Sequence, residues 1–472
     1  MYKFLYSFLL LSFLSIKIFG QDSLRQPLFT IVDIEIEGNK KTKEQVVFRE
    51  LKFKESEQYT LEYLLSVQEE SEERLKNIGV FNDAELAYGI DSINYEVTAF
   101  VDVVENWYIF PGLIIELADR NFSEWWTNQN RDLSRINYGV RLEHINLTGR
   151  RDKMIVQLQS GFRKKYEIIY NLPYLNQEGT WGAEAFVFFA TQDELAYLTS
   201  NNRSIFSKTN DRNTIYRRFR TGSALFYRPT IYNNHAFRLE YHREQVENKV
   251  IEDFNPDYFL DGNSIKYFMF NYQFIQDKRV AQFYPIRGYL WFVSLRKDGF
   301  KIFDEYNNAS VTAGGEYFQP LSEKLVLGTK LKFKLNIDRS VVSYANNQAL
   351  GYRDDVLGGY YLYVVDGTDY VYGKNNLRYK LIDKKFNLGK YMFLDQFRVL
   401  SVQLYGRLFF DYGYVNDRTY RDLYDNTFNN RWLYGWGPAV DIVLYNNYKA
   451  SFNLGINHLG ERHYFFEYRT NF

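Results

Sequence analysis

Apolar and polar residues alternate along most of the chain after Tyr108. Mostly apolar residues occupy every second position from Leu325 to Ile337, and Lys330, Lys332 and Lys334 face the other way. This period of two predicts β-strands with one apolar face and one polar face. A sandwich would bury the three lysines against a second sheet, whereas a barrel with a wet lumen can solvate them. The pattern therefore favours a transmembrane β-barrel over a soluble protein built from several sandwiches.

Sixteen antiparallel strands are predicted in residues 107–472. Their average spacing of roughly 23 residues suits membrane strands of about ten residues joined by short turns and long loops. The expected strands are 109–118, 135–147, 152–163, 165–171, 180–193, 213–228, 234–247, 265–277, 287–297, 307–318, 323–337, 373–382, 398–414, 434–445, 448–457 and 463–472.

Residues 28–106 have a different pattern, which predicts a small α+β domain in the order strand, helix, helix, strand, strand. The first helix is expected to begin with a capping box formed by Thr42 and Gln45. The second is expected to begin at Thr60 and to bury several leucines, Leu65 among them.

Composition narrows the class of protein further. No stretch of eighteen uncharged apolar residues follows residue 20, which excludes a helical membrane protein. The 42 Tyr and 40 Phe suit the aromatic girdles of an outer-membrane barrel, and its alternating strands explain a mean hydropathy of −0.42. Residues 1–20 have the pattern of a secretory signal peptide. Lys plus Arg equals Asp plus Glu at 58 each, so no basic excess indicates nucleic-acid binding.

The last predicted strand has aromatic residues on one face. Tyr464, Phe466, Tyr468 and Phe472 share that face with Thr470. A strand that ends in an aromatic residue is typical of outer-membrane barrels, in which assembly factors recognise it by edge-to-edge pairing. The sequence thus predicts a protein of the outer membrane of a Gram-negative bacterium.

Several motifs resemble the BamA/TamA superfamily, in which POTRA domains precede an outer-membrane barrel. EIEGNKKT, LKNIGVFNDAEL and VDVVEN resemble parts of a single POTRA domain in the periplasm, and LADRNFSEWW resembles the barrel start of short members of Bacteroidetes type. QDKRVAQFYPIRGY, with Pro285, Arg287 and Gly288, is similar to the family's FPTRG motif. The segment VLGGYYLYVVDGTDYVYGKNNLRYKL resembles the family's long sixth outer loop and the strand after it.

The sixth-loop motif departs from the family. There the loop tip carries an arginine that pairs with an acidic residue on a barrel strand. The matching residues here are Leu357-Gly358-Gly359-Tyr360, and a second register gives Ala349-Leu350-Gly351-Tyr352, so arginine is missing in both. The acidic residue of this pair is retained as Asp411, and Arg407 or Arg353 could form an ion pair with it.

The resemblance implies a seam between the first and last barrel strands that opens sideways so that a client strand can add to its edge. Pro111 and Gly112 lie at the start of the first strand, and Pro111 either weakens this seam or only ends the linker. The implied partners are unfolded outer-membrane proteins or an exported client, periplasmic or lipoprotein accessory subunits, and membrane lipids. The alternative is a structural or pore-forming paralogue without insertase activity.

Enzymatic chemistry is not expected. The five histidines show no metal-binding spacing, and there is no cysteine and no nucleophile elbow. No metal or other cofactor is therefore predicted. The acidic run from Glu69 to Glu73 is either a solvated helix face or a site for a basic partner. The inward Lys and Arg residues form either an anion-preferring pore or ion-pair ladders, and the balanced charge favours the ladders.

Overall fold

The computed structural model describes residues 27–176, 178–207, 214–280, 282–303, 306–389, 399–419, 425–445 and 447–470. The chain divides into two compact units, Met1–Trp107 and Tyr108–Phe472. The expected signal peptide and the terminal Phe472 lie outside the described residues. Among the helices of the described ranges, none combines the length and apolar character that a membrane-crossing helix needs.

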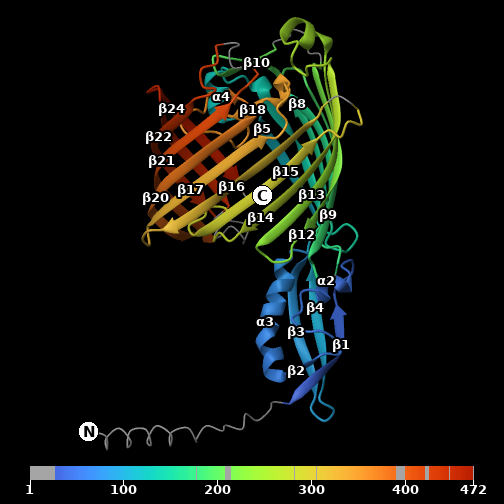
Figure 1. The fold of residues 1–472 in the computed structure, drawn as a ribbon. Helices are drawn as coiled ribbons and strands as arrows, with labels where there is room; N and C mark the ends of the chain where they lie inside the picture. The colour runs from blue at the N-terminus through green and yellow to red at the C-terminus, as the bar shows by residue number, and fades with distance from the viewer. Residues whose placement is uncertain are drawn as a thin grey trace, which may run out of the picture. The chain divides into compact units, whose positions relative to one another are not determined.

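The first unit is a four-stranded sheet with two helices, in the strand order β2-β1-β4-β3. Its elements are β1 (Leu28–Glu37), α2 (Glu44–Phe48), β2 (Gln58–Thr60), α3 (Leu61–Asn77), β3 (Phe81–Asp91) and β4 (Glu96–Glu105). The predicted order of elements is confirmed, and β2 is an additional short strand. Helix α3 lies along the sheet (Figure 1) and buries Leu64, Val67 and Leu75.

Two local predictions in this unit are wrong. The first helix does not begin with Thr42 as its cap residue: α2 begins at Glu44, its cap residue is Lys43, and the Thr42 N–H donates to the Glu105 carboxylate at 2.6 Å. Leu65 is 55% exposed. Successive residues of a helix are rotated by about 100° about its axis. Because Leu64 faces the sheet, the side chain of Leu65 points away from it. The predicted start of α3 is confirmed, since the Thr60 side chain accepts a hydrogen bond from the N–H of the third residue after it.

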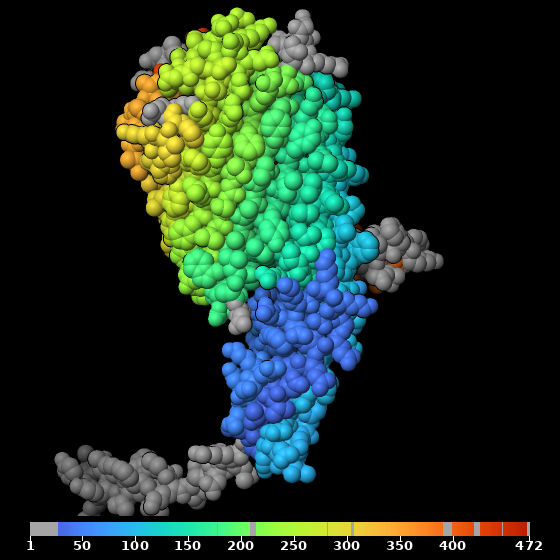
Figure 2. Space-filling view, turned by 90° about the vertical axis from the view of Figure 1, so that its right-hand side faces the viewer, coloured from blue at the N-terminus to red at the C-terminus, as the bar shows by residue number. Residues whose placement is uncertain are grey.

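The second unit contains a sheet of sixteen strands that follow one another in chain order, and all neighbouring pairs are antiparallel. Figure 1 shows this sheet curling into a barrel of tilted strands, and Figure 2 shows one side of its wall as a continuous surface. The predicted number of strands is confirmed. The strands are β5 (Ile109–Leu117), β6 (Ile136–His144), β7 (Lys153–Gly161), β8 (Arg163–Leu172), β9 (Trp181–Gln192), β12 (Tyr216–Tyr227), β13 (Asn233–Val246), β14 (Ser264–Asp277), β15 (Gly288–Asp298), β16 (Asn308–Pro320), β17 (Leu325–Asn336), β20 (Asp369–Asn387), β21 (Val399–Asn416), β22 (Trp432–Leu444), β23 (Tyr448–Asn457) and β24 (Arg462–Thr470).

Inward-facing charges of the barrel form ion pairs. Lys332 contacts Asp355 at 2.7 Å, and Lys330 contacts Glu316 at 3.6 Å. Further lumenal pairs are Arg279–Asp277, Arg279–Glu316, Arg218–Glu244, Arg238–Glu184, Arg296–Asp298 and Arg407–Asp441. These pairs support the ladder interpretation of the inward Lys and Arg residues.

Long loops gather at the end of the barrel where β5 terminates, which is called the loop end here. The sixth connection at this end, residues 337–368, is called the sixth loop. The loops contain α4 (Phe122–Thr127), η1 (Leu133–Arg135), β10 (Ala196–Ser200), β11 (Arg203–Phe206), the π-helical turn η2 (Val250–Phe254), η3 (Tyr344–Asn346), β18 (Gln348–Leu350) and β19 (Val365–Asp366).

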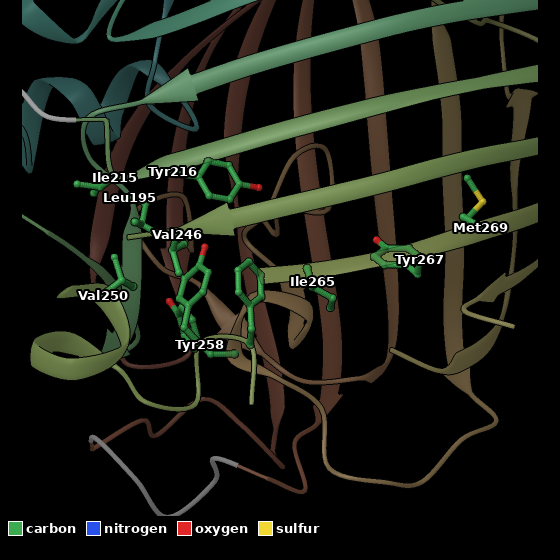
Figure 3. Packing of buried hydrophobic residues seen from close by; sticks show 11 residues of the cluster. Leu195, Ile215, Tyr216, Val246, Val250, Tyr258, Ile265, Tyr267 and Met269 are labelled. Carbon is green, nitrogen blue, oxygen red and sulfur yellow. The ribbon is translucent and has the colours of Figure 1, made fainter. Parts of the chain in front are cut away.

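Separate loops are joined to one another at the loop end. Figure 3 shows an apolar cluster in which Leu195, Val250 and Tyr258 from two loops meet the ends of β12, β13 and β14. Tyr344 of the sixth loop belongs to the same cluster. The side-chain oxygen of Asn202 accepts hydrogen bonds from the backbone of the loop between β21 and β22. The backbone carbonyl of Asn202 accepts a hydrogen bond from the backbone of the sixth loop.

Candidate functional site at the barrel seam

The sixteen-stranded sheet ends in β5 on one side and in β24 on the other. Between residues 110–117 of β5 and the described residues of β24, no ladder of backbone pairs is present. Side chains on both strands are more exposed than a side chain inside the wall. The exposed fraction is 84% for Leu113 and 79% for Tyr464, compared with 48% for Leu331 within the wall. The predicted residue Gly112 also lies in this exposed stretch of β5. These two edges form the seam of the barrel.

The nitrogen of Pro111 faces the seam. The N–H of Ile145 donates to the carbonyl of Tyr108 at 3.0 Å, and that of Ala118 donates to the carbonyl of Arg135 at 2.8 Å. Backbone groups alternate between the two sides of an antiparallel strand, so the even-numbered residues of β5 bond to β6 and the odd-numbered ones face the seam. Since proline has no N–H, this edge lacks one donor. Pro111 thus lies within β5, with its nitrogen on the seam side.

On β24 the predicted seam residues also direct their backbone groups to the free edge. The N–H of Asn457 donates to the carbonyl of Glu461 at 3.1 Å, which turns the odd-numbered residues of β24 toward β23. Tyr464, Phe466 and Tyr468 therefore present their backbone to the seam. Phe472, the remaining predicted seam residue, lies outside the described residues.

The sixth-loop motif is held by a backbone hydrogen bond where the family pattern has an arginine side chain. The N–H of Gly358 donates to Oδ2 of Asp411 at 2.9 Å. A Cβ on Gly358 would lie 2.2 Å from Cε2 of Phe409, so the Phe409 ring occupies the space that any side chain at position 358 would need. Lys374 stands opposite Asp411 on β20. Asp411 thus accepts a hydrogen bond from the sixth loop although the arginine of the family motif is missing.

Glycines on two strands let the motif approach the barrel wall. A Cβ on Gly435 of β22 would lie 2.0 Å from the carbonyl oxygen of Gly358, and one on Gly455 of β23 would lie 2.5 Å from the nitrogen of Gly359. Gly359 has a φ of 83°, a conformation that favours glycine. Tyr360, which completes the motif, is 3% exposed. The loop tip therefore packs backbone to backbone against β22 and β23.

The second register of the motif is buried together with the first. Ala349 and Leu350 share one apolar cluster with Leu357. The Tyr352 hydroxyl donates to Asp366 at 2.5 Å. Burial raises the pKa of Asp366 to about 6. Both candidate segments thus contribute to the anchoring of the sixth loop, although by different contacts.

The two arginines considered as partners of Asp411 form no ion pair with it among the described residues. Arg407 donates to Asp441 at 2.8 Å and to Asn453 at 2.6 Å. Arg353 is exposed at a φ of 51°, and within the described ranges it forms no ion pair with Asp411. Neither side chain replaces the arginine of the family motif.

The turn that contains Pro285, Arg287 and Gly288 packs into the barrel. Arg378 of β20 donates to the carbonyl of Pro285 at 3.0 Å, and the hydroxyl of the buried Tyr284 donates to Asp441 at 2.8 Å. Gly288 has a φ of 98°, whereas Arg287 is exposed. The contact with β22 is thus made by Tyr284, which sequence reasoning missed.

Sequence reasoning also missed the short helix α4 and its contacts. The spacing of Asn121 and Glu124 resembles a capping box, and the Asn121 side chain does accept the Glu124 N–H at 2.8 Å. That signal could have identified the helix but not what it contacts. In the part of the chain that is described, no group of three or more His, Asp or Glu side chains could hold a metal ion.

Comparisons with known proteins agree with this architecture. Residues 29–105 match the family model POTRA, described as a surface antigen variable number repeat. BamA from Haemophilus ducreyi lacking POTRA domains 1–3 has the same fold, with a TM-score of 0.65 and 14% identity over 94% of this chain and 85% of that one. CdiB from Escherichia coli is similar with a TM-score of 0.55 and 11% identity, over 93% of this chain and 75% of that one. No protein of curated function matches in sequence. The predicted resemblance to POTRA-plus-barrel proteins is confirmed for fold and domain order.

Proposed function

We propose that this chain is an outer-membrane protein of a Gram-negative bacterium that inserts or translocates other proteins, with its POTRA domain in the periplasm. The observation that carries the proposal is the seam, where residues 110–117 of β5 form no backbone ladder with the described residues of β24. A strand edge with free backbone groups can accept an added strand, so a client can pair there without covalent chemistry. The fold shared with BamA and CdiB supports this non-enzymatic role.

The POTRA domain offers a second edge for a client or an accessory subunit. Strand β3 is an outer strand of its sheet and pairs only with β4 in the described structure. Residues 28–106 contain 18 Asp and Glu but 8 Lys and Arg, and β1, β3 and β4 carry no basic residue. An extended segment that adds to β3 would therefore be favoured if it were basic. The acidic run from Glu69 to Glu73 lies on α3 and adds to this charge.

The joined loops argue for an assembly or translocation factor over an open pore. Val364 of the sixth loop donates its N–H to the carbonyl of Asn202, and the Asn429 side chain donates to the carbonyl of Asp366 at 2.8 Å. Contacts between three loops at the loop end oppose a permanently open channel. The proposed path for a client is therefore the seam.

Reconstitution in liposomes tests this function. A small outer-membrane barrel diluted from urea should fold faster in vesicles with the protein than in empty ones. Replacement of Pro111 by alanine restores an N–H donor on the β5 edge, and one further hydrogen bond of about 0.5–1.5 kcal/mol across the seam would slow folding about 2- to 12-fold. The matched control is Pro320→Ala in β16, which lies opposite Val326 within the wall.

Client folding that is no faster than in empty liposomes would overturn the insertase proposal. Steady ion conductance in the same vesicles, without client folding, would identify the pore-forming alternative instead. Equal slowing of client folding by Pro111→Ala and Pro320→Ala would show that the seam does not take part in client folding.

A further inference from the structure

The segment from Asp119 to Thr127, which follows β5, contacts both the sixth loop and the edge of β24. We propose that this segment, called the latch here, holds the loop-end half of the seam closed, and that Arg120 and Ser123 are its positioning residues. The inference rests on the proposed function in so far as seam opening serves a client. The latch contacts themselves are independent of any client.

Arg120 ties the latch to the backbone of the sixth loop. Its Nη1 donates to the carbonyl oxygens of Gly351 at 2.8 Å and Tyr363 at 3.0 Å, and the Asn121 side chain donates to the carbonyl of Tyr361 at 2.9 Å. The Glu124 carboxylate forms an ion pair with the Arg120 guanidinium at 3.0 Å, and the Glu124 side chain is 4% exposed. Such a partly buried, multiply bonded arginine is costly to displace, because its donors and the carbonyls would lose their partners together.

Ser123 bonds directly to the free edge of β24. Its hydroxyl donates to the carbonyl of Tyr464 at 3.2 Å, one of the groups that faces the seam. The ring of Phe122 packs edge-on against Phe466, with ring centroids 5.9 Å apart. The latch thus supplies a donor and an aromatic contact where a neighbouring strand would otherwise pair with β24.

The other end of the latch is fixed to the wall beside β5. Arg135, 4% exposed at its side chain, contacts Asp119 at 2.8 Å and Glu194 at 2.6 Å. The sixth loop is itself bound to β24, since the Tyr361 and Phe465 rings stack with centroids 3.8 Å apart. Opening of the seam at the loop end must therefore break the Ser123 and Phe122 contacts and also separate Arg120 from the sixth loop.

The distance across the seam tests the latch without a client. The chain has no cysteine, so spin labels can be placed at Ile115→Cys on β5 and Tyr464→Cys on β24, both highly exposed side chains. In Arg120→Ala, electron–electron distance measurements should show a new population longer by about one strand spacing, ~5 Å. Ser123→Ala should produce a smaller population of the same kind. Arg120→Lys should be intermediate, because one ammonium cannot reproduce the fork of a guanidinium.

The matched control is Arg131→Ala. Arg131 lies in the same loop with its guanidinium 4.3 Å from the centre of the Trp126 ring, and in the described structure its side chain forms no hydrogen bond or ion pair with β24 or the sixth loop. Unchanged distances in both Arg120→Ala and Ser123→Ala would overturn the latch. The nearly isosteric Ser123→Ala keeps the test valid if Arg120→Ala fails to fold.

A reversible crosslink separates the latch from the proposed function. Phe122→Cys and Phe466→Cys, joined by a short reducible crosslinker, should reduce client folding to the rate of empty liposomes, with recovery after reduction. Equal folding before and after reduction would overturn the latch as a control on the seam. Absent client folding combined with a distance change in Arg120→Ala would overturn the proposed function but leave the latch intact.

Discussion

Replacement of Gly358 by alanine should release the sixth loop from the barrel wall. The added Cβ would lie 2.2 Å from Cε2 and 2.7 Å from Cδ2 of Phe409, so the ring must move. That movement would disturb the hydrogen bond from the Gly358 N–H to Asp411 at 2.9 Å. Overpacking of a tight contact costs about 1–3 kcal/mol. If this cost falls on loop docking alone, the undocked population rises about 5- to 150-fold.

Protease cleavage of the sixth loop in the folded barrel measures this population. When the loop opens and closes faster than it is cut, the cleavage rate follows the open fraction. The matched control is Gly406→Ala on the same strand as Phe409, where an added Cβ would make an ordinary 3.6 Å contact with Leu381. Cleavage of Gly358→Ala at the rate of the unchanged protein and of Gly406→Ala would refute glycine packing as the anchor of the loop.

Three further predictions concern single contacts. Asp411→Ala leaves the Gly358 N–H without its acceptor, so sixth-loop cleavage should accelerate, about 5- to 150-fold for a loss of about 1–3 kcal/mol. The pKa of Asp366, raised to about 6, means that the folded loop binds a proton more tightly than the unfolded one. Protonated Asp366 stabilises the docked loop, and this contribution is complete at pH values below the pKa of the unfolded state and is lost as the pH rises through about 6. Cleavage of the sixth loop should therefore accelerate from pH 5 to pH 7.5, and the acceleration should be smaller in Asp366→Asn. Thr60→Ala removes the cap of α3 at a cost of about 1 kcal/mol, and hydrogen exchange of α3 amides should accelerate about fivefold. No change in the respective rates would contradict each prediction.

The missing arginine of the sixth loop does not leave that loop unanchored. Gly358, Gly435 and Gly455 allow close backbone contact, and Asp411 accepts a backbone N–H. Such an anchor depends on shape more than on charge, so it should be less sensitive to salt than an ion pair. Conversely, a Gly358→Arg substitution meant to restore the family motif would collide with Phe409.

The sequence by itself determined the elements and their order. Period-two alternation marks a strand wherever one face meets lipid and the other meets water, so the sixteen strands could be recognised one by one. The POTRA domain was equally accessible, because its helices and strands have separate periodicities. The error at the start of the first helix arose where a distant residue intervened, because Glu105 accepts the Thr42 N–H.

Only the tertiary structure decided how the site is assembled. The partner of a lumenal side chain depends on strand register and on loops that fold inward, so Arg407 faces Asp441 while Asp411 receives Gly358. The contact of Ser123 with Tyr464 joins residues 341 positions apart, a relation that no local pattern can encode. Closure of the barrel brings the first and last strands together, and this long-range geometry places the latch on the seam.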